Sequence, residues 1–283
     1  MEIKDVALEI RKNVFKMACR ANGGHIAPAF SVTDIIAELY FDEILRYDAK
    51  NPFWEDRDFL ILSKGHGVLA LYSALAMTGY FPMEELSTFC HINSRLGSLA
   101  KAGSVPGIEA TTGSLGHGLS YGVGIALANK IDNKDNKVYV ILGDGECQEG
   151  SVWEGIMSAS HHQLDNLTII IDNNKLQAMD SVDNIMSINE FSSKLSAFGL
   201  DVIEIDGHDF NELHEAFCKK VIDRPKAIIA NTIKGKGISF MENIPIWHYR
   251  IPNEQEMEIA LKELKLTREE LGNYEKCLFR NII

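Results

Sequence analysis

The first part of the chain carries hydrophobic positions at helical spacing and one short continuous apolar run. Residues 4–21 place apolar side chains on one face and end at the glycine pair 23–24, which predicts an amphipathic helix. A second helix is expected to begin near Ser31, where residues 31–34 resemble a capping box with a shorter acid. The apolar run at residues 58–63 then predicts a buried strand, and an apolar helix should follow as far as Met77.

The second part of the chain alternates apolar runs with amphipathic stretches, the pattern of repeated strand–helix–strand units. The runs are continuous rather than alternating, as strands buried on both faces of a parallel sheet require. Strands are expected at residues 137–143, 167–172, 201–206 and 226–233, and helices between them at 151–164, 187–199 and 211–223.

This order predicts an α/β fold in which a doubly wound, mostly parallel sheet is flanked by helices. No internal repeat and no long linker divides the chain, so residues 1–283 are expected to form a single domain. From about residue 254 the sequence is charged and helical, which predicts a solvated helical tail.

Composition and charge narrow the range of partners. The chain has 283 residues, 46% of them hydrophobic, and a formal net charge of −12. An acidic chain with scattered lysines and arginines is repelled by phosphate backbones and anionic lipid, so we expect neither nucleic-acid nor membrane binding. No apolar run approaches the ~20 residues of a membrane span, and no signal peptide is evident.

The five cysteines are far apart and form no CxxC pair, which favours reduced thiols over a disulfide framework or a zinc knuckle. A cytoplasmic location is the expectation that follows.

Polar residues follow two neighbouring predicted strands, and they point to a metal site. Asp144 comes directly after one strand and Asn174 after the next, with one helix between them. Ligands of open parallel sheets bind at the carboxyl ends of the strands, so both side chains are expected at one edge. A carboxylate, an amide oxygen and a main-chain carbonyl such as that of Leu176 would suit Mg²⁺, or Ca²⁺ or Mn²⁺ in its place, bridged to a diphosphate.

A Rossmann dinucleotide site is the rival interpretation of the same segment, because Gly143 and Gly145 follow a strand and Asp172 ends the next. Three observations oppose it. Gln148 replaces the third glycine, Asp172 lies well beyond the usual interval of ~20 residues, and Asp144 would repel a pyrophosphate without a cation.

The GDG sequence at residues 143–145, with the Asn pair that follows the next strand, resembles the thiamine diphosphate motif. The chain as a whole resembles the N-terminal, diphosphate-binding domain of transketolase. GDG alone would be weak evidence, but the matching segments occur in order along nearly the whole chain: ANGGHIAPAFS, LSKGHGVLALYSALAMTGYF, PGIEATTGSLGHGLSYGVGIALA, GDGECQEGSVWEG and DNNKLQ.

The resemblance implies a set of cofactor and metal contacts. Asp144 and Asn174 would be metal ligands and Leu176 would add its carbonyl. Gly145 would contact the diphosphate, and Glu149 would belong to a network that links paired cofactor sites. The TTG loop would meet the cofactor through Gly113, Ser114 and Leu115.

The resemblance also implies three catalytic histidines, His25, His66 and His248, of which His66 and His248 would contact the cofactor as well. An imidazole in such a position can transfer protons to and from a sugar hydroxyl or stabilise an oxyanion. Tyr249 follows His248 where the family usually has glycine.

Two further departures from the family concern the substrate. A further histidine is usual just before the TTG loop, and an ungapped count places Ala100 there, with Lys101 or His91 as possible replacements. His117 stands where glutamine is common. These changes leave the cofactor assignment intact and allow for an unusual substrate, such as a sulfonated or branched sugar phosphate.

The family's pyrimidine-binding domain, which carries the glutamate that activates the cofactor, has no counterpart in the printed sequence. We therefore expect an N-terminal subunit of a split transketolase, active only with a C-terminal subunit that carries that domain, in an α₂β₂ heterotetramer. Such an enzyme would transfer a two-carbon ketol unit from a ketose phosphate to an aldose.

Two competing enzyme classes remain, 2-oxo acid dehydrogenases of the α type and the deoxyxylulose-phosphate-synthase type, although LSKGHG and PGIEATTGSLGHG favour transketolase. A non-catalytic sensor of the metal–diphosphate complex is the alternative from another functional class.

Overall fold

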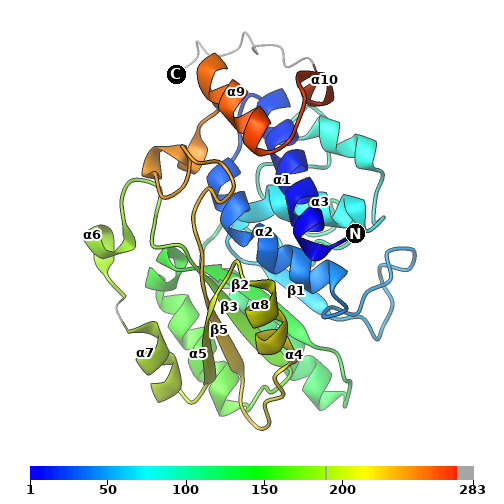
Figure 1. Ribbon diagram of the computed structural model, residues 1–283. Helices are drawn as coiled ribbons and strands as arrows, with labels where there is room; N and C mark the ends of the chain where they lie inside the picture. Colours follow the sequence, from blue (N-terminus) through cyan, green and yellow to red (C-terminus); the bar gives the residue numbers. More distant parts are fainter. Residues whose placement is uncertain (189, 273–283) are drawn as a thin grey trace.

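The computed structural model of the protein describes residues 1–188 and 190–272, and it is built around one parallel sheet (Figure 1). The five strands lie in the order β1-β2-β3-β5-β4, and every neighbouring pair is parallel. The predicted parallel α/β sheet is therefore confirmed. The strands are β1 (Phe59–Leu62), β2 (Val138–Gly143), β3 (Leu167–Asn173), β4 (Asp201–Asp206) and β5 (Lys226–Asn231).

Side chains of the central strands alternate between two hydrophobic cores, because successive residues of a strand face opposite sides of a sheet. On β1, Leu60 and Leu62 pack into one core, whereas Ile61 packs into the other. The first core is covered by α1 (Ile3–Arg20), α2 (Ile26–Phe41), α3 (Val68–Met77) and α8 (Phe210–Cys218). The second is covered by α4 (His117–Ile131), α5 (Gly150–His161) and α7 (Phe191–Ala197).

The second helix begins at Ile26, so the prediction of a start near Ser31 is wrong. Ser31 lies inside α2, and its hydroxyl donates to the Asp172 carboxylate instead of capping a helix. Nearly every residue of α2 is buried, which removes the polar face that marks a helix in sequence. Pro28 lies in the first turn, where a missing N–H costs the helix nothing.

Two other helices differ from the prediction. The helix expected at 187–199 is the shorter α7, and a separate short helix, α6 (Val182–Met186), precedes that range. Helix α8 ends at Cys218, before the expected end at residue 223. Strand β4 is an edge strand and is only partly buried, which contradicts the expected continuous burial.

The tail is helical as expected, with α9 (Glu254–Glu263) and α10 (Arg268–Leu271), but it is not simply a solvated cover. Met257, Ala260 and Leu261 are buried in the first core. The expectation for residues 273–283, including Cys277, lies outside the described residues. Within the described part of the chain, no helix combines the length and apolar character needed to cross a membrane.

Candidate functional site

The three residues predicted to hold a metal meet at the carboxyl edge of the sheet, where β2 and β3 end. Asp144 is 3% exposed, and its Oδ1 accepts a 2.7 Å hydrogen bond from the backbone N–H of Gly145. Its Oδ2 accepts from the N–H of Lys175, the residue between Asn174 and Leu176. Lys175 has a φ of 65°, and this left-handed conformation turns the chain sharply after β3.

Asn174 is held so that its oxygen remains an available ligand. Its Nδ2 donates to the Asp172 carboxylate at 3.3 Å, and its Oδ1 accepts from the N–H of Leu176 at 3.1 Å. An amide oxygen has two lone pairs, so Oδ1 can still bind a cation. Burial, and then the neighbouring Asp172, raise the pKa of Asp144 to about 6.

A buried ion pair lies beneath this edge and was not predicted. Lys64 and Asp172 are in direct contact, and both side chains are fully buried. Asp172 also accepts hydrogen bonds from the hydroxyls of Ser31 and Thr232. The Lys64 charge and these donors keep the pKa of Asp172 below its ordinary value against the effect of burial. The network ties α2, the end of β3 and the segments after β1 and β5 to one carboxylate.

Glu146 is a second buried carboxylate, and it joins three of the predicted cofactor loops. Its Oε1 accepts a 2.5 Å hydrogen bond from the Ser63 hydroxyl, after β1, and a 2.8 Å bond from the N–H of Gly116, in the TTG loop. Its Oε2 accepts a 2.9 Å bond from the N–H of Gly143, at the end of β2. The three loops are thereby fixed relative to one another.

The three predicted catalytic histidines form a cluster. The ring centroids of His25 and His248 are 5.2 Å apart, those of His66 and His248 are 5.4 Å apart, and those of His25 and His66 are 6.1 Å apart. Tyr249, the departure from the family pattern, packs its ring 4.7 Å from that of His25. Burial and the nearby Lys234 lower the pKa of His25 to about 4. The pKa of His66 is shifted in the same direction, chiefly by burial, so both rings are neutral at pH 7.

Lys234 is a further site residue that the sequence prediction missed. It is 1% exposed, and its ammonium group donates to the carbonyls of Leu176 and Gln177 at 3.2 and 2.7 Å. It also lies 3.0 Å from Nδ1 of His248. An ammonium group can only donate, so Nδ1 accepts and the His248 proton is on Nε2. Burial, and then Lys64, lower the pKa of Lys234 to about 8.

The remaining predicted contacts lie around the same edge. A Cβ on Gly113 would meet the Leu99 side chain at 2.9 Å, and one on Gly65, beside His66, would meet the same side chain at 3.1 Å. The TTG loop therefore adjoins the segment that carries His66. A Cβ on Gly145 would meet Gln177 at 2.7 Å, so the backbone passes where no side chain fits.

Three further predicted contacts are more open to solvent. Ser114 is exposed and lies 3.4 Å from Nδ1 of His117, and the carbonyl of Leu115 lies 3.2 Å from the same nitrogen. Glu149 is exposed at the start of α5, beside Gly116.

The position of the absent family histidine is buried. Ala100 is 3% exposed, and its carbonyl accepts a 2.9 Å hydrogen bond from the N–H of Thr112. Next to it is a hollow of about 450 Å³, whose lining includes Arg95, Leu99 and Lys101 but not His91. Of the two suggested replacements, Lys101 is the one that lines a cavity beside the TTG loop.

A match to a known protein family covers nearly the whole chain. Residues 3–270 match the family described as transketolase, thiamine diphosphate binding domain. The chain belongs to the transketolase family. The predicted resemblance is confirmed, and the transketolase interpretation prevails over the Rossmann alternative.

Transketolase subunits of similar length are among its relatives. An apulose-4-phosphate transketolase subunit of Actinobacillus succinogenes is 40% identical over 266 residues, which cover 93% of this chain and 96% of the relative. The 6-deoxy-6-sulfo-D-fructose transketolase subunit SqwG of a Clostridium species is 39% identical, covering 94% of this chain and 97% of the relative.

Solved transketolases share the fold. The transketolase of Leishmania mexicana superposes with a TM-score of 0.87 at 28% identity over 97% of this chain. This chain spans only 42% of that protein, so it corresponds to less than half of the solved transketolase.

The residues that the sequence analysis missed share one feature. Lys64, Glu146, Asp172 and Lys234 are all buried charged groups that follow or end strands at the functional edge. Lys64 and Lys234 follow β1 and β5, whereas Glu146 and Asp172 follow or end the same strands that led to Asp144 and Asn174.

Proposed function

We propose that this chain is the N-terminal subunit of a two-subunit transketolase that binds thiamine diphosphate with a divalent cation and transfers a two-carbon ketol unit between sugar phosphates. The observation that carries the proposal is that Asp144, Asn174 and Leu176 lie together at one sheet edge and that Lys234 joins the Leu176 carbonyl to the histidine cluster. Relatives of matching length that are named as transketolase subunits support it.

The residues at this edge fit a metal and a diphosphate. A carboxylate, an amide oxygen and a backbone carbonyl are the oxygen ligands that Mg²⁺, Ca²⁺ or Mn²⁺ prefer. The buried Lys234 ammonium adds a positive charge near Asp144. Gly113 and Gly145, which pack closely against Leu99 and Gln177, are the proposed backbone contacts of the cofactor. Ser114, Leu115 and Glu149 complete the proposed contacts at the TTG loop and the start of α5.

Bound thiamine diphosphate supplies carbanion chemistry at its thiazolium ring, and the chain supplies position and proton transfer. His25 is neutral, and a neutral imidazole can accept a proton from a sugar hydroxyl. The His248 tautomer fixed by Lys234 offers an Nε2–H donor. His66 belongs to the same neutral cluster and is proposed to face both cofactor and substrate.

The substrate is proposed to be a sugar phosphate, or a related anionic sugar, other than the usual substrates of transketolases. Named relatives act on apulose 4-phosphate and on 6-deoxy-6-sulfo-D-fructose. In this chain the buried Ala100 stands where the family usually has a histidine, so the site has one polar side chain fewer. Lys101 lines the adjacent hollow and offers its ammonium group to an anionic group of the sugar.

The partner is proposed to be a C-terminal subunit that carries the pyrimidine-binding domain, in an α₂β₂ assembly in the cytoplasm. Relatives that are named as subunits, rather than as whole enzymes, support a partner, and exposed Glu149 is available for contacts between paired sites. The four cysteines in the described residues are free thiols, in keeping with a reducing compartment.

Calorimetric titration with thiamine diphosphate and Mg²⁺ tests the cofactor assignment. We expect Asp144→Ala to abolish magnesium-dependent binding, because it removes the only carboxylate of the proposed ligand set. Asp132→Ala, at the exposed end of α4, is the matched control and should bind normally. Retained magnesium-dependent binding in Asp144→Ala would remove the metal-site assignment.

A further inference from the structure

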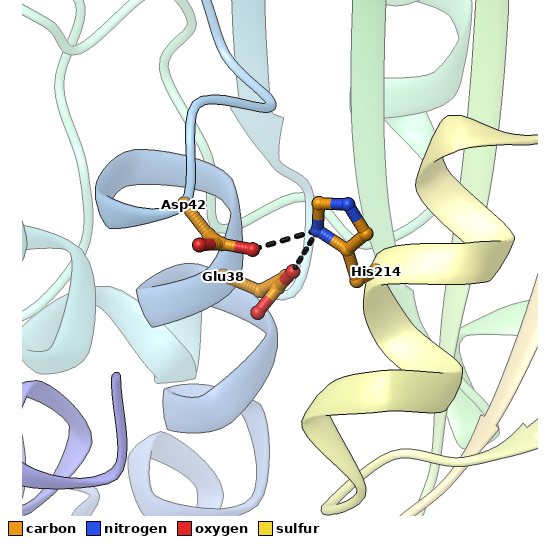
Figure 2. A group of neighbouring side chains, drawn as sticks. All are labelled: Glu38, Asp42 and His214. Atoms are coloured by element: carbon orange, nitrogen blue, oxygen red, sulfur yellow. Dashed lines mark hydrogen bonds and ion pairs between the residues drawn. The ribbon is translucent and has the colours of Figure 1, made fainter. Parts of the chain in front are cut away.

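A second group of ligand-type side chains lies away from the cofactor edge, between α2 and α8. Glu38 and Asp42 are one turn apart at the end of α2, and His214 faces both from α8 (Figure 2). Nδ1 of His214 is 2.6 Å from Oδ2 of Asp42 and 3.2 Å from Oε1 of Glu38. The three ligand atoms lie within 4.8 Å of one another.

The buried member of this group is incompletely satisfied. The Glu38 side chain is 1% exposed and directs Oε1 at the His214 ring, whereas its Oε2 is buried and has no hydrogen-bond partner within the described residues. A buried carboxylate beside a second carboxylate is costly unless a cation compensates it.

The surroundings suit a cation. The cluster lies at the carboxyl end of α2, where the helix dipole is negative. The side chains of Asp42 and His214 are 45% and 48% exposed, so an ion can enter from solvent and both ligands can adjust. Sγ of Cys218, one turn along α8, is 3.4 Å from Nε2 of His214. Nδ1–H of His214 donates to both carboxylates, and a divalent cation that binds here would displace that proton.

We propose that Glu38, Asp42 and His214 form a second metal site, which takes a divalent transition ion of the Zn²⁺ class. One imidazole nitrogen with two carboxylates is a mixed donor set that favours such ions over Mg²⁺ or Ca²⁺. The site is distinct from the cofactor edge because it lies at the opposite end of α2 from His25. A bound ion would brace α2, which carries His25 immediately before its first residue, against α8.

Titration of this chain with Zn²⁺ tests this site. The chain is freed of metal with a chelator and titrated calorimetrically in excess Mg²⁺, which occupies oxygen-ligand sites. We expect one Zn²⁺ to bind per chain, with affinity at least about tenfold weaker in His214→Ala and in Asp42→Asn, since even indirect partners of a metal cost that much. Glu215→Gln, the adjacent exposed acid on α8, is the control and should bind as the unaltered chain does.

A second readout keeps the test independent of folding. Zn²⁺ should shift the Nδ1 resonance of His214 in imidazole ¹⁵N spectra and should raise the Tm of the unaltered chain but not of His214→Ala. Equal Zn²⁺ affinity in all variants, or no stoichiometric binding, would overturn the proposal. Neither result would bear on the cofactor assignment, because that assignment depends on Asp144.

Discussion

Their surroundings keep the three site histidines, His25, His66 and His248, neutral. Burial is the largest cause of the lowered pKa in each, and Lys234 adds positive charge beside His25 and His248. A neutral imidazole is the form that can take up a proton from a hydroxyl at pH 7. The same shift ties the stability of the chain to pH.

His25 should make the chain less stable as pH falls below its ordinary pKa of 6.5. Its folded-state pKa is about 4, so between pH 6.5 and pH 4 the unfolded chain binds a proton that the folded chain does not. After allowance for partial exposure, we expect His25→Gln to remove roughly 1 kcal/mol of the stability lost between pH 7 and pH 5. Urea unfolding at both pH values measures this difference.

His161→Gln, at the exposed end of α5, is the control for that experiment. If His25→Gln and the unaltered chain lost the same free energy of unfolding between pH 7 and pH 5, the proposed neutral state of His25 would be wrong.

At the scale of single residues, sequence reasoning succeeded where a side chain followed a recognisable strand. Asp144 and Asn174 were predicted in this way and lie together. Lys64 and Lys234 were missed because a lysine is normally a surface residue, and nothing local marks one as buried. The Glu38 and His214 contact joins residues far apart in sequence, so only the packing of α2 on α8 reveals it.

At the scale of elements, one carboxylate organises the loops that would hold the cofactor. Glu146 accepts hydrogen bonds from the loop after β1, from the TTG loop and from the end of β2. Removing it leaves a hydroxyl and two backbone N–H groups without an acceptor, and each buried unsatisfied group costs about 1–3 kcal/mol.

We therefore expect Glu146→Ala to lower the free energy of unfolding by about 2–4 kcal/mol and to weaken thiamine diphosphate binding. Glu146→Gln keeps one acceptor oxygen and the same shape, so it should lose less of both. Urea unfolding and calorimetric titration measure the two effects, with Glu84→Ala at an exposed position as the control. Unchanged cofactor affinity in Glu146→Ala would show that these loops do not depend on the carboxylate.

The strands were predicted more closely than the helices because the central strands are buried on both faces and form continuous apolar runs. Helix α2 lacks a polar face, and its start was therefore misplaced. The edge strand β4 shows the converse, since its apolar residues are only partly buried once it has a single neighbour. Burial depends on neighbours that sequence periodicity does not specify.

At the scale of the whole molecule, the functional edge of an acidic protein holds two buried lysines. The formal net charge is −12, yet Lys64 and Lys234 are buried at the carboxyl ends of the strands. Lys64 is paired with Asp172, so it is Lys234, beside Leu176 and His248, that offers a positive charge to a diphosphate. The chain corresponds to less than half of a solved transketolase. The proposed function therefore assigns the pyrimidine-binding domain to a partner.

The most direct test of the proposed function is a ketol-transfer assay of this chain reconstituted with a separately produced C-terminal transketolase subunit. Thiamine diphosphate, Mg²⁺ and a panel of anionic ketose donors are supplied, and both subunits are also assayed separately. We predict activity in the mixture and none in either component by itself. Ketol transfer by the isolated chain would contradict the proposed function, as would an inactive mixture whose components associate and bind the cofactor.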